Sequence, residues 1–178
     1  MDMTKEFPAL PRGFFERDAV TAARELAGCR VARRMPDGSL RVLTITETEA
    51  YCGEEDSACH AHRGKTRRNA PLYERGGIFY VYLCYGIHWM LNAVTGPEGR
   101  PQGVLIRACE GEPGPGRLTR ALAIDGSFTG EEVDRCPELR FVPREGEWEI
   151  STAPRVGIGY ASPEDQARPW RFIARRAD

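Results

Sequence analysis

The chain has 178 residues, a length that suits one domain with a sizeable hydrophobic core. Apolar residues make up 41% of it and charged residues 29%, which predicts a soluble globular protein, and the absence of any run of 18 apolar residues argues against a membrane-spanning helix. The net charge of −1 excludes a strongly basic protein, although a local basic patch could still bind a polyanion, because phosphate contacts need only one face.

The N-terminal segment and the cysteines both bear on the cellular compartment. Residues 1–15 lack the charged and then apolar pattern of a secretion signal, so a cytoplasmic location is expected. The six cysteines are irregularly spaced and form no CxxC motif, which in a cytoplasmic chain predicts reduced and mostly buried thiols.

The first part of the chain predicts a helix followed by a β-hairpin. Residues 8–15 contain two prolines and are expected to be extended. Residues 17–28 predict a short helix, with an aspartate N-cap, an apolar stripe and a glycine at its end. Residues 29–34 and 39–51 have the composition of two strands around the turn sequence Pro-Asp-Gly.

The rest of the chain predicts a long loop and then mainly strands. Residues 52–77 are polar, basic and glycine-containing, and long loops of this kind are often functional. The expected elements after it are strands at 78–84, 87–95 and 103–110, a helix at 114–124, a mixed segment at 131–150, and closing strands or extended segments at 154–161 and 169–175. Because the strands neighbour one another rather than alternating with helices, a single, mostly antiparallel α+β domain over 1–178 is expected.

Two carboxylates lie two residues apart at the end of the second predicted strand. A period of two places Glu47, Glu49 and Tyr51 on one face together with Leu43 and Ile45, so this face begins apolar and ends acidic. One interpretation is a strand that runs out of the core into solvent. The other is a carboxylate beside an aromatic wall, which could take a proton from water and stabilise a developing cation.

An aromatic run, FYVYLCYG, occupies the next predicted hairpin. Tyr80 and Tyr82 share a face, and Tyr85 precedes Gly86 at the turn, where its side chain could project freely. Such runs are more often core packing. Tyrosine rings can nevertheless stack on nucleic-acid bases, and an exposed aromatic at a hairpin tip could enter a base stack.

Four possible zinc ligands lie within eleven residues: Cys52, Cys59, His60 and His62. Their C-x6-C-H-x-H order matches no familiar finger or deaminase spacing, and adjacent cysteine and histidine side chains rarely both reach one tetrahedral metal. Structural or stacking roles for His60 are favoured, and no metal or cofactor is expected. A zinc-dependent protein built on these four residues stays an alternative.

Positive charge gathers in the long loop. Between His62 and Gly77 the sequence has one acidic residue, Glu74, and the following basic residues: Arg63, Lys65, Arg67, Arg68 and Arg75. Solvated arginine loops explain the pattern as well as a phosphate-binding face does. Lys5 and Lys65 are the chain's only lysines and neither has an apolar setting, so a Schiff-base lysine is poorly supported.

Taken together, several stretches resemble the alkyladenine (3-methyladenine) DNA glycosylase family. The stretches that carry the resemblance are ETEAY, DSACHAHRGKTRRN, YVYLCYGIHWMLN and GVLIRACEG. Further similarity in FFERDAVTAARELAG, GPGRLTRALAI and PRVGI extends it, in order, over nearly the whole chain. The resemblance implies a curved antiparallel sheet with flanking helices and a protruding β-hairpin.

The resemblance also implies an activity. Members of this family flip a damaged purine out of duplex DNA and hydrolyse its bond to the sugar, leaving an abasic site. Glu49 aligns with the general base that deprotonates the attacking water, and Arg107 aligns with an arginine that supports this water. The implied substrates are double-stranded DNA with 3-methyladenine, 7-methylguanine, hypoxanthine or ethenoadenine, and the implied enzyme is a monofunctional monomer.

Further alignments give the expected contacts to DNA. Tyr51, His60 and Tyr82 align with side chains that stack around the flipped base, and Asn92 aligns with an asparagine that disfavours the 2-amino group of guanine. Tyr85 aligns with the tyrosine that enters the gap in the duplex. Among the basic loop residues, the expected DNA contacts are Arg63, Lys65, Arg67 and Arg68. A domain of the same fold that binds nucleic acid without turnover is the competing hypothesis.

Overall fold

The computed structural model describes residues 3–178, so residues 1 and 2 of the expected domain lie outside it. Its elements, in chain order, are α1 (Met3–Glu6), α2 (Arg12–Phe15), α3 (Ala19–Leu26), β1 (Arg30–Arg34), β2 (Leu40–Tyr51), the 3-10 helix η1 (Ala70–Tyr73), β3 (Phe79–Cys84), β4 (His88–Val94), β5 (Gly103–Cys109), α4 (Pro115–Ala121), the 3-10 helix η2 (Gly126–Phe128), β6 (Leu139–Val142), β7 (Trp148–Ala153), α5 (Pro163–Ala167) and β8 (Arg171–Arg176).

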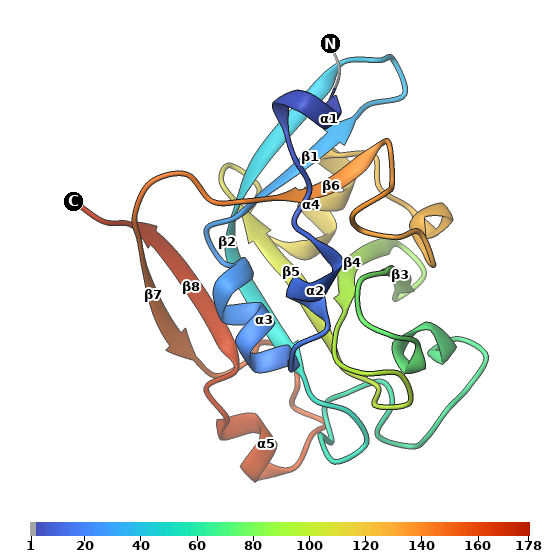
Figure 1. Ribbon diagram of the computed structural model, residues 1–178. Coiled ribbons are helices and arrows are strands. Elements are labelled where there is room, and N and C mark those ends of the chain that lie inside the picture. Colours follow the sequence, from blue (N-terminus) through green and yellow to red (C-terminus); the bar gives the residue numbers. More distant parts are fainter. Residues whose placement is uncertain (1–2) are drawn as a thin grey trace.

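The strands form one curled antiparallel sheet (Figure 1). Its order is β3-β4-β5-β2-β1-β6, and β8 pairs with both β2 and β7. The helices are few and short and lie around this sheet, so the predicted α+β class is confirmed. β2 is the central strand, since β1 pairs along its first half while β5 and β8 pair along its second half.

A bulge in β2 corrects the predicted alternation of its side chains. The pairing of β2 with β5 shifts register between Ile45 and Glu47 and again between Glu47 and Thr48. A bulge adds a residue to one strand and so changes which side chains share a face. Ile45 therefore packs in the main core with Ala50, and the Thr48 hydroxyl on that same side donates to the Ala23 carbonyl of α3 at 2.7 Å.

The bulge separates the apolar part of β2 from its acidic end. Leu43 and Ile45 belong to the core side, and so they do not share a face with the two glutamates as strict alternation predicted. Glu47 and Glu49 do lie together, because one guanidinium, that of Arg107, reaches both of their carboxylates. The acidic end of β2 thus faces away from α3, on the opposite side of the sheet from the core.

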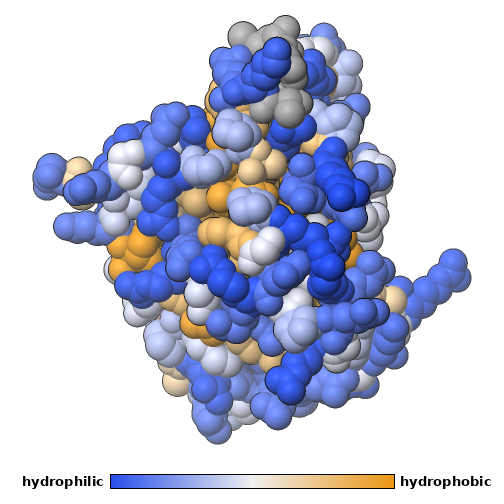
Figure 2. All heavy atoms as spheres, in the orientation of Figure 1, coloured by the Kyte–Doolittle hydropathy of each residue, from blue (hydrophilic) through white to orange (hydrophobic). Residues whose placement is uncertain are grey.

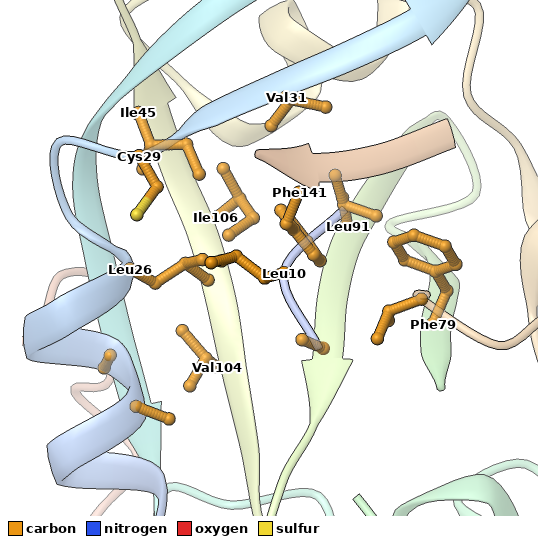
Figure 3. Packing of buried hydrophobic residues seen from close by; sticks show 14 of the residues in the cluster. Leu10, Leu26, Cys29, Val31, Ile45, Phe79, Leu91, Val104, Ile106 and Phe141 are labelled. Carbon is orange, nitrogen blue, oxygen red and sulfur yellow. The ribbon is translucent and has the colours of Figure 1, made fainter. Parts of the chain in front are cut away.

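The core lies between α3 and the sheet (Figure 3). Side chains from helix, loop and strands converge there, among them Leu10, Leu26, Val104, Ile106 and Phe141. Full burial of a large apolar side chain contributes about 1.5–3 kcal/mol, so these residues fix the position of β2 and β5.

The aspartate and the glycine that the sequence predicted at the two ends of the helix do flank α3. The Asp18 side chain accepts from the Thr21 N–H at 2.9 Å. Gly28 follows the helix with φ 85°, and a Cβ there would lie 3.0 Å from the Trp148 ring, so the turn requires glycine in both respects.

Three local expectations differ from the structure. Residues 8–15 are not wholly extended, because Arg12–Phe15 form the helical turn α2 after Pro11. Residues 154–161 form turns rather than a strand. The short helix α5 was not predicted, although Ser162 accepts from the Asp165 N–H and precedes a proline, a recognisable helix start.

The outer surface is mainly hydrophilic in the view of Figure 2, with apolar areas small and interrupted. Within residues 3–178, no helix combines the length and the apolar character needed to cross a membrane. All six cysteines are free thiols; four are buried and two half-buried, as predicted for a chain without disulfides.

Candidate active site

A cavity of about 430 Å³ opens on the side of the sheet that carries the acidic end of β2. Segments far apart in sequence enclose it: the end of β2, the 52–77 loop, the β3–β4 hairpin, β5 and the turn at 154–161. The predicted site residues that line it are Glu49, Tyr51, His60, Arg68, Tyr82, Tyr85 and Arg107. The fold therefore brings these residues together from separate segments of the chain.

Glu49 is a fully buried carboxylate on the wall of this cavity. Its Oε2 accepts from the Val156 N–H at 2.6 Å, and its Oε1 accepts from the Tyr51 hydroxyl at 3.1 Å. Burial raises the pKa of Glu49, and the Val156 N–H, Arg107 and the Tyr51 hydroxyl partly oppose that rise. A carboxylate with a raised pKa is a better proton acceptor once ionised, which is the property of a general base.

Arg107 lies between the two glutamates of β2. Its Nε is 3.9 Å from Glu49 Oε2 and 4.0 Å from Glu47 Oε2. Glu47 is also bound by Arg171, whose Nη1 lies 3.1 Å from the same Oε2. Glu47 thus lies between Arg171 and Arg107, and Arg107 lies between Glu47 and Glu49.

Aromatic rings line the cavity beside Glu49. The His60 and Tyr82 rings lie 4.4 Å apart between centroids, and Tyr80 and Tyr82 lie 5.4 Å apart. Burial, and to a lesser extent the Arg68 charge, lower the pKa of His60, so its imidazole is neutral at neutral pH. Burial raises the pKa of Tyr51 well above its ordinary value, so its hydroxyl stays protonated and donates to Glu49.

A smaller chamber of about 50 Å³ continues the aromatic part of the cavity inward. Asn92 lines this chamber from β4. Its side-chain amide donates to the Tyr80 and Met90 carbonyls, both at 3.1 Å, so the orientation of the amide is fixed by backbone. Asn92 therefore forms a rigid polar wall.

Tyr85 occupies the tip of the β3–β4 hairpin and is 91% exposed. Its φ of 51° is in the left-handed region that non-glycine residues seldom adopt, and Gly86 follows with φ 69°. The turn therefore directs the tyrosine ring away from the core, at the edge of the cavity that it helps to line.

Comparison with known proteins decides the family. The sequence model described as methylpurine-DNA glycosylase (MPG) matches residues 13–113 and 110–178. A protein of Methanocella arvoryzae is 40% identical over 93% of this chain and 92% of its own length, and one of Anaeromyxobacter dehalogenans is 44% identical over 93% and 83%. Both carry the name "Putative 3-methyladenine DNA glycosylase". The chain belongs to the methylpurine-DNA glycosylase family.

In this member of the methylpurine-DNA glycosylase family the basic loop lies next to the cavity but contributes only in part to its lining. Arg63, Lys65 and Arg67 do not line the cavity, and all three are exposed to solvent. Arg68 does line it; its guanidinium donates to the Leu83 carbonyl at 2.5 Å and lies over the Tyr82 ring.

Asn69 organises this loop and was not among the predicted site residues. It is buried, its amide donates to the His60 and Gly64 carbonyls at 3.0 Å each, and its Oδ1 accepts from the Thr66 N–H. A buried asparagine inside a basic, glycine-containing loop is the sequence signal that could have identified it.

A buried ion pair joins the two loops that flank Glu49, and sequence reasoning missed it. Arg155 donates to Asp56 through both Nη atoms, at 2.6 and 2.9 Å, and the two side chains are 0% and 1% exposed. The Arg155 guanidinium also lies over the rings of Tyr51 and Trp170. The pair is separated by 99 residues, so no local pattern indicates it.

The four residues of the zinc alternative have other contacts. His60 packs on Tyr82, and His62 Nδ1 lies 2.8 Å from the Glu54 carbonyl. Burial raises the pKa of the Cys52 thiol to about 12 and raises that of Cys59. Among residues 3–178, no three or more His, Cys, Asp or Glu side chains gather in a way that could hold a metal ion.

Proposed function

We propose that this protein is a monofunctional DNA glycosylase that removes damaged purines from duplex DNA by hydrolysis. The substrate class is that of 3-methyladenine, 7-methylguanine, hypoxanthine and ethenoadenine. The observation that carries the proposal is the position of Glu49, a buried carboxylate with a raised pKa on the wall of an aromatic cavity, beside Arg107.

The aromatic lining accounts for capture of a damaged base. Extruding a base from the duplex costs a few kcal/mol, and least for a damaged or mispaired base. Stacking on Tyr51, His60 and Tyr82 returns ~1–3 kcal/mol for each base–aromatic contact. The balance favours lesions, and a neutral His60 does not repel the positive charge of an alkylated purine.

Glu49 acts as the general base in the hydrolytic step. It takes a proton from a water molecule whose oxygen attacks C1′ of the sugar, and the N-glycosidic bond breaks with its electrons moving to the departing base. The negative carboxylate also stabilises the oxocarbenium-like transition state. Arg107 orients the water and keeps Glu49 ionised. Because water is the nucleophile, the product is an intact abasic site.

The hairpin and the basic loop hold the DNA. Tyr85, exposed at the hairpin tip, fills the space that the flipped nucleotide leaves in the duplex. The exposed cations Arg63, Lys65 and Arg67 contact phosphates next to the lesion, while Arg68 lies at the cavity wall. Asn92, held by two backbone carbonyls, disfavours the 2-amino group of guanine. 7-Methylguanine is removed despite this group, because its positive charge makes it a better leaving group than undamaged guanine. The protein acts as a monomer in the cytoplasm.

The proposal is tested with a panel of duplexes that each carry one lesion. Single-turnover reactions should release at least one of hypoxanthine, ethenoadenine and 7-methylguanine, while undamaged guanine stays in place. The DNA strand should remain whole until alkali is added, and then break at the lesion. Strand cleavage before alkali would contradict the monofunctional mechanism. Binding of lesion DNA without release of any base would favour the alternative, a catalytically inactive binding domain of the same fold.

A further inference from the structure

The smaller chamber of about 50 Å³ is a distinct part of the cavity, and it lies on the side away from Glu49 and Arg107. Both spaces share the aromatic walls Tyr51, His60 and Tyr82. Glu49 and Arg107 line only the larger space. A base stacked between the shared walls, with its sugar at Glu49, would therefore point its far edge into the chamber.

Two residues from different elements limit the depth of the chamber. Leu72, on η1, and Gly103, at the start of β5, both line it. A Cβ built at position 103 would lie 3.2 Å from Leu72 Cδ2 and 3.4 Å from the Ala93 carbonyl oxygen. Gly103 is not in the left-handed region, so its backbone conformation does not require glycine; a Cβ there would press on the Leu72 side chain and reduce the space of the chamber.

The polar wall Asn92 and the apolar wall Leu72 are held in different ways. Asn92 is locked by its two bonds to backbone carbonyls. Leu72 packs in an apolar cluster with Tyr80 and Ile78. The space of about 50 Å³ is a few times the ~10–15 Å³ that a single water needs. It therefore has room for a few atoms, such as a methyl group or a two-carbon bridge.

We propose that Leu72, facing Gly103, sets the size limit for the damaged base. The chamber accepts the extra atoms of purines that carry an added alkyl group or a small fused ring, and Leu72 is the residue that determines this specificity. The inference rests on the proposed function and adds to it the structural feature that selects among lesions.

The test measures binding in the Glu49→Gln background, so that it does not depend on base release. Two duplexes of identical sequence are compared: one contains ethenoadenine, with its two-carbon bridge, and the other contains hypoxanthine, which lacks one. Leu72→Phe and Gly103→Ala reduce the chamber and should weaken ethenoadenine binding about tenfold relative to hypoxanthine. Leu72→Ala enlarges the chamber and should shift the ratio of the two Kd values in the opposite direction.

Leu91→Ala is the matched control for loss of apolar volume. Leu91 is fully buried in the main core and does not line the chamber, so this variant should lose stability without changing the ratio of Kd values. An unchanged ratio in Leu72→Phe and Gly103→Ala, with lesion binding intact, would overturn the size limit alone. If the Glu49→Gln protein bound neither lesion duplex better than undamaged DNA, the size limit and the proposed function would fall together.

Discussion

At the scale of single residues, the proposed catalysis depends on how Glu49 is held. The sequence placed Glu49 and Tyr51 side by side, because both lie on one strand and the spacing of two is visible in the chain. It could not place the Val156 N–H, which is 107 residues away and lies 2.6 Å from the carboxylate. Backbone donors of this kind follow from tertiary structure and leave no sequence signature, because almost any residue type can supply them.

Arg107→Gln is expected to move the acidic limb of the activity profile to higher pH. In the proposed mechanism ionised Glu49 is the base, so activity should fall as pH drops through its pKa, which burial already raises. Removing the Arg107 charge, which lowers this pKa, raises it further. Single-turnover base release measured against pH gives the position of the limb.

Arg171→Gln is the control for that profile. It also removes a positive charge near the site, but Arg171 binds Glu47 rather than Glu49. The acidic limb of the Arg171→Gln activity profile should stay closer to that of the wild type. If Arg107→Gln and the wild type lose activity over the same pH range, Arg107 does not stabilise ionised Glu49.

At the scale of elements, the sequence predicted each paired strand that carries site residues, but not the details that aim the side chains. The alternation in β3 and β4 and the Tyr85-Gly86 turn were sufficient to predict the hairpin. The bulge in β2 could not be predicted, because it arises from the pairing of β2 with β5. The alternation of apolar and polar residues in the β2 sequence does not reveal it. The apolar residues of 154–161 predict a strand or an extended segment, but they line a cavity rather than a sheet face, and the segment forms turns.

Tyr85→Ala is expected to weaken binding to lesion-containing duplex and to leave the fold intact. The side chain is 91% exposed, so its removal takes away no core packing. Loss of one stacked aromatic costs ~1–3 kcal/mol of binding free energy. Equilibrium binding to a hypoxanthine duplex, with thermal unfolding in parallel, measures both effects. Tyr85→Phe keeps the aromatic ring and should bind like the wild type. Undiminished binding by Tyr85→Ala would show that the Tyr85 side chain does not contact the DNA.

Asp56→Asn is expected to destabilise the protein by about 3–5 kcal/mol, because it leaves the buried Arg155 charge without its partner. The same change should loosen the loop that holds the Val156 N–H against Glu49 and so lower activity. Urea unfolding of Asp56→Asn, Arg155→Gln and the double variant measures the coupling. The double variant should be less destabilised than the sum of the two single changes; simple additivity would show that the pair does not act as a unit.

At the scale of the whole molecule, β2 divides the protein into two sides. One side buries Ile45 and Thr48 against α3 and supplies stability, while the other presents Glu49 and Tyr51 to the cavity. The near-zero net charge hides this division, since the loop that carries Arg63 and Lys65 is basic while the chain as a whole is not. Composition alone could not indicate DNA binding, whereas the position of the loop beside the cavity favours it.

Replacing Arg63, Lys65 and Arg67 by glutamine should weaken binding to damaged and undamaged duplex alike. Removal of each phosphate-binding cation should reduce the slope of log Kd against log salt by about 0.9. Arg24→Gln is the control, because Arg24 is an exposed cation on α3, on the other side of β2. A salt slope unchanged in the triple variant would show that these cations do not contact phosphates.

The most direct test of the central claim compares base release by the wild type with that by Glu49→Gln on one lesion duplex that both bind. We predict unchanged lesion binding and a rate of release lower by roughly 100-fold or more. Thermal unfolding checks the fold: burial raises the pKa of Glu49 above its unfolded value, so its ionisation costs stability at neutral pH, and the uncharged glutamine should unfold no earlier than the wild type. Release by Glu49→Gln within a few-fold of the wild-type rate would contradict the claim that Glu49 activates the water.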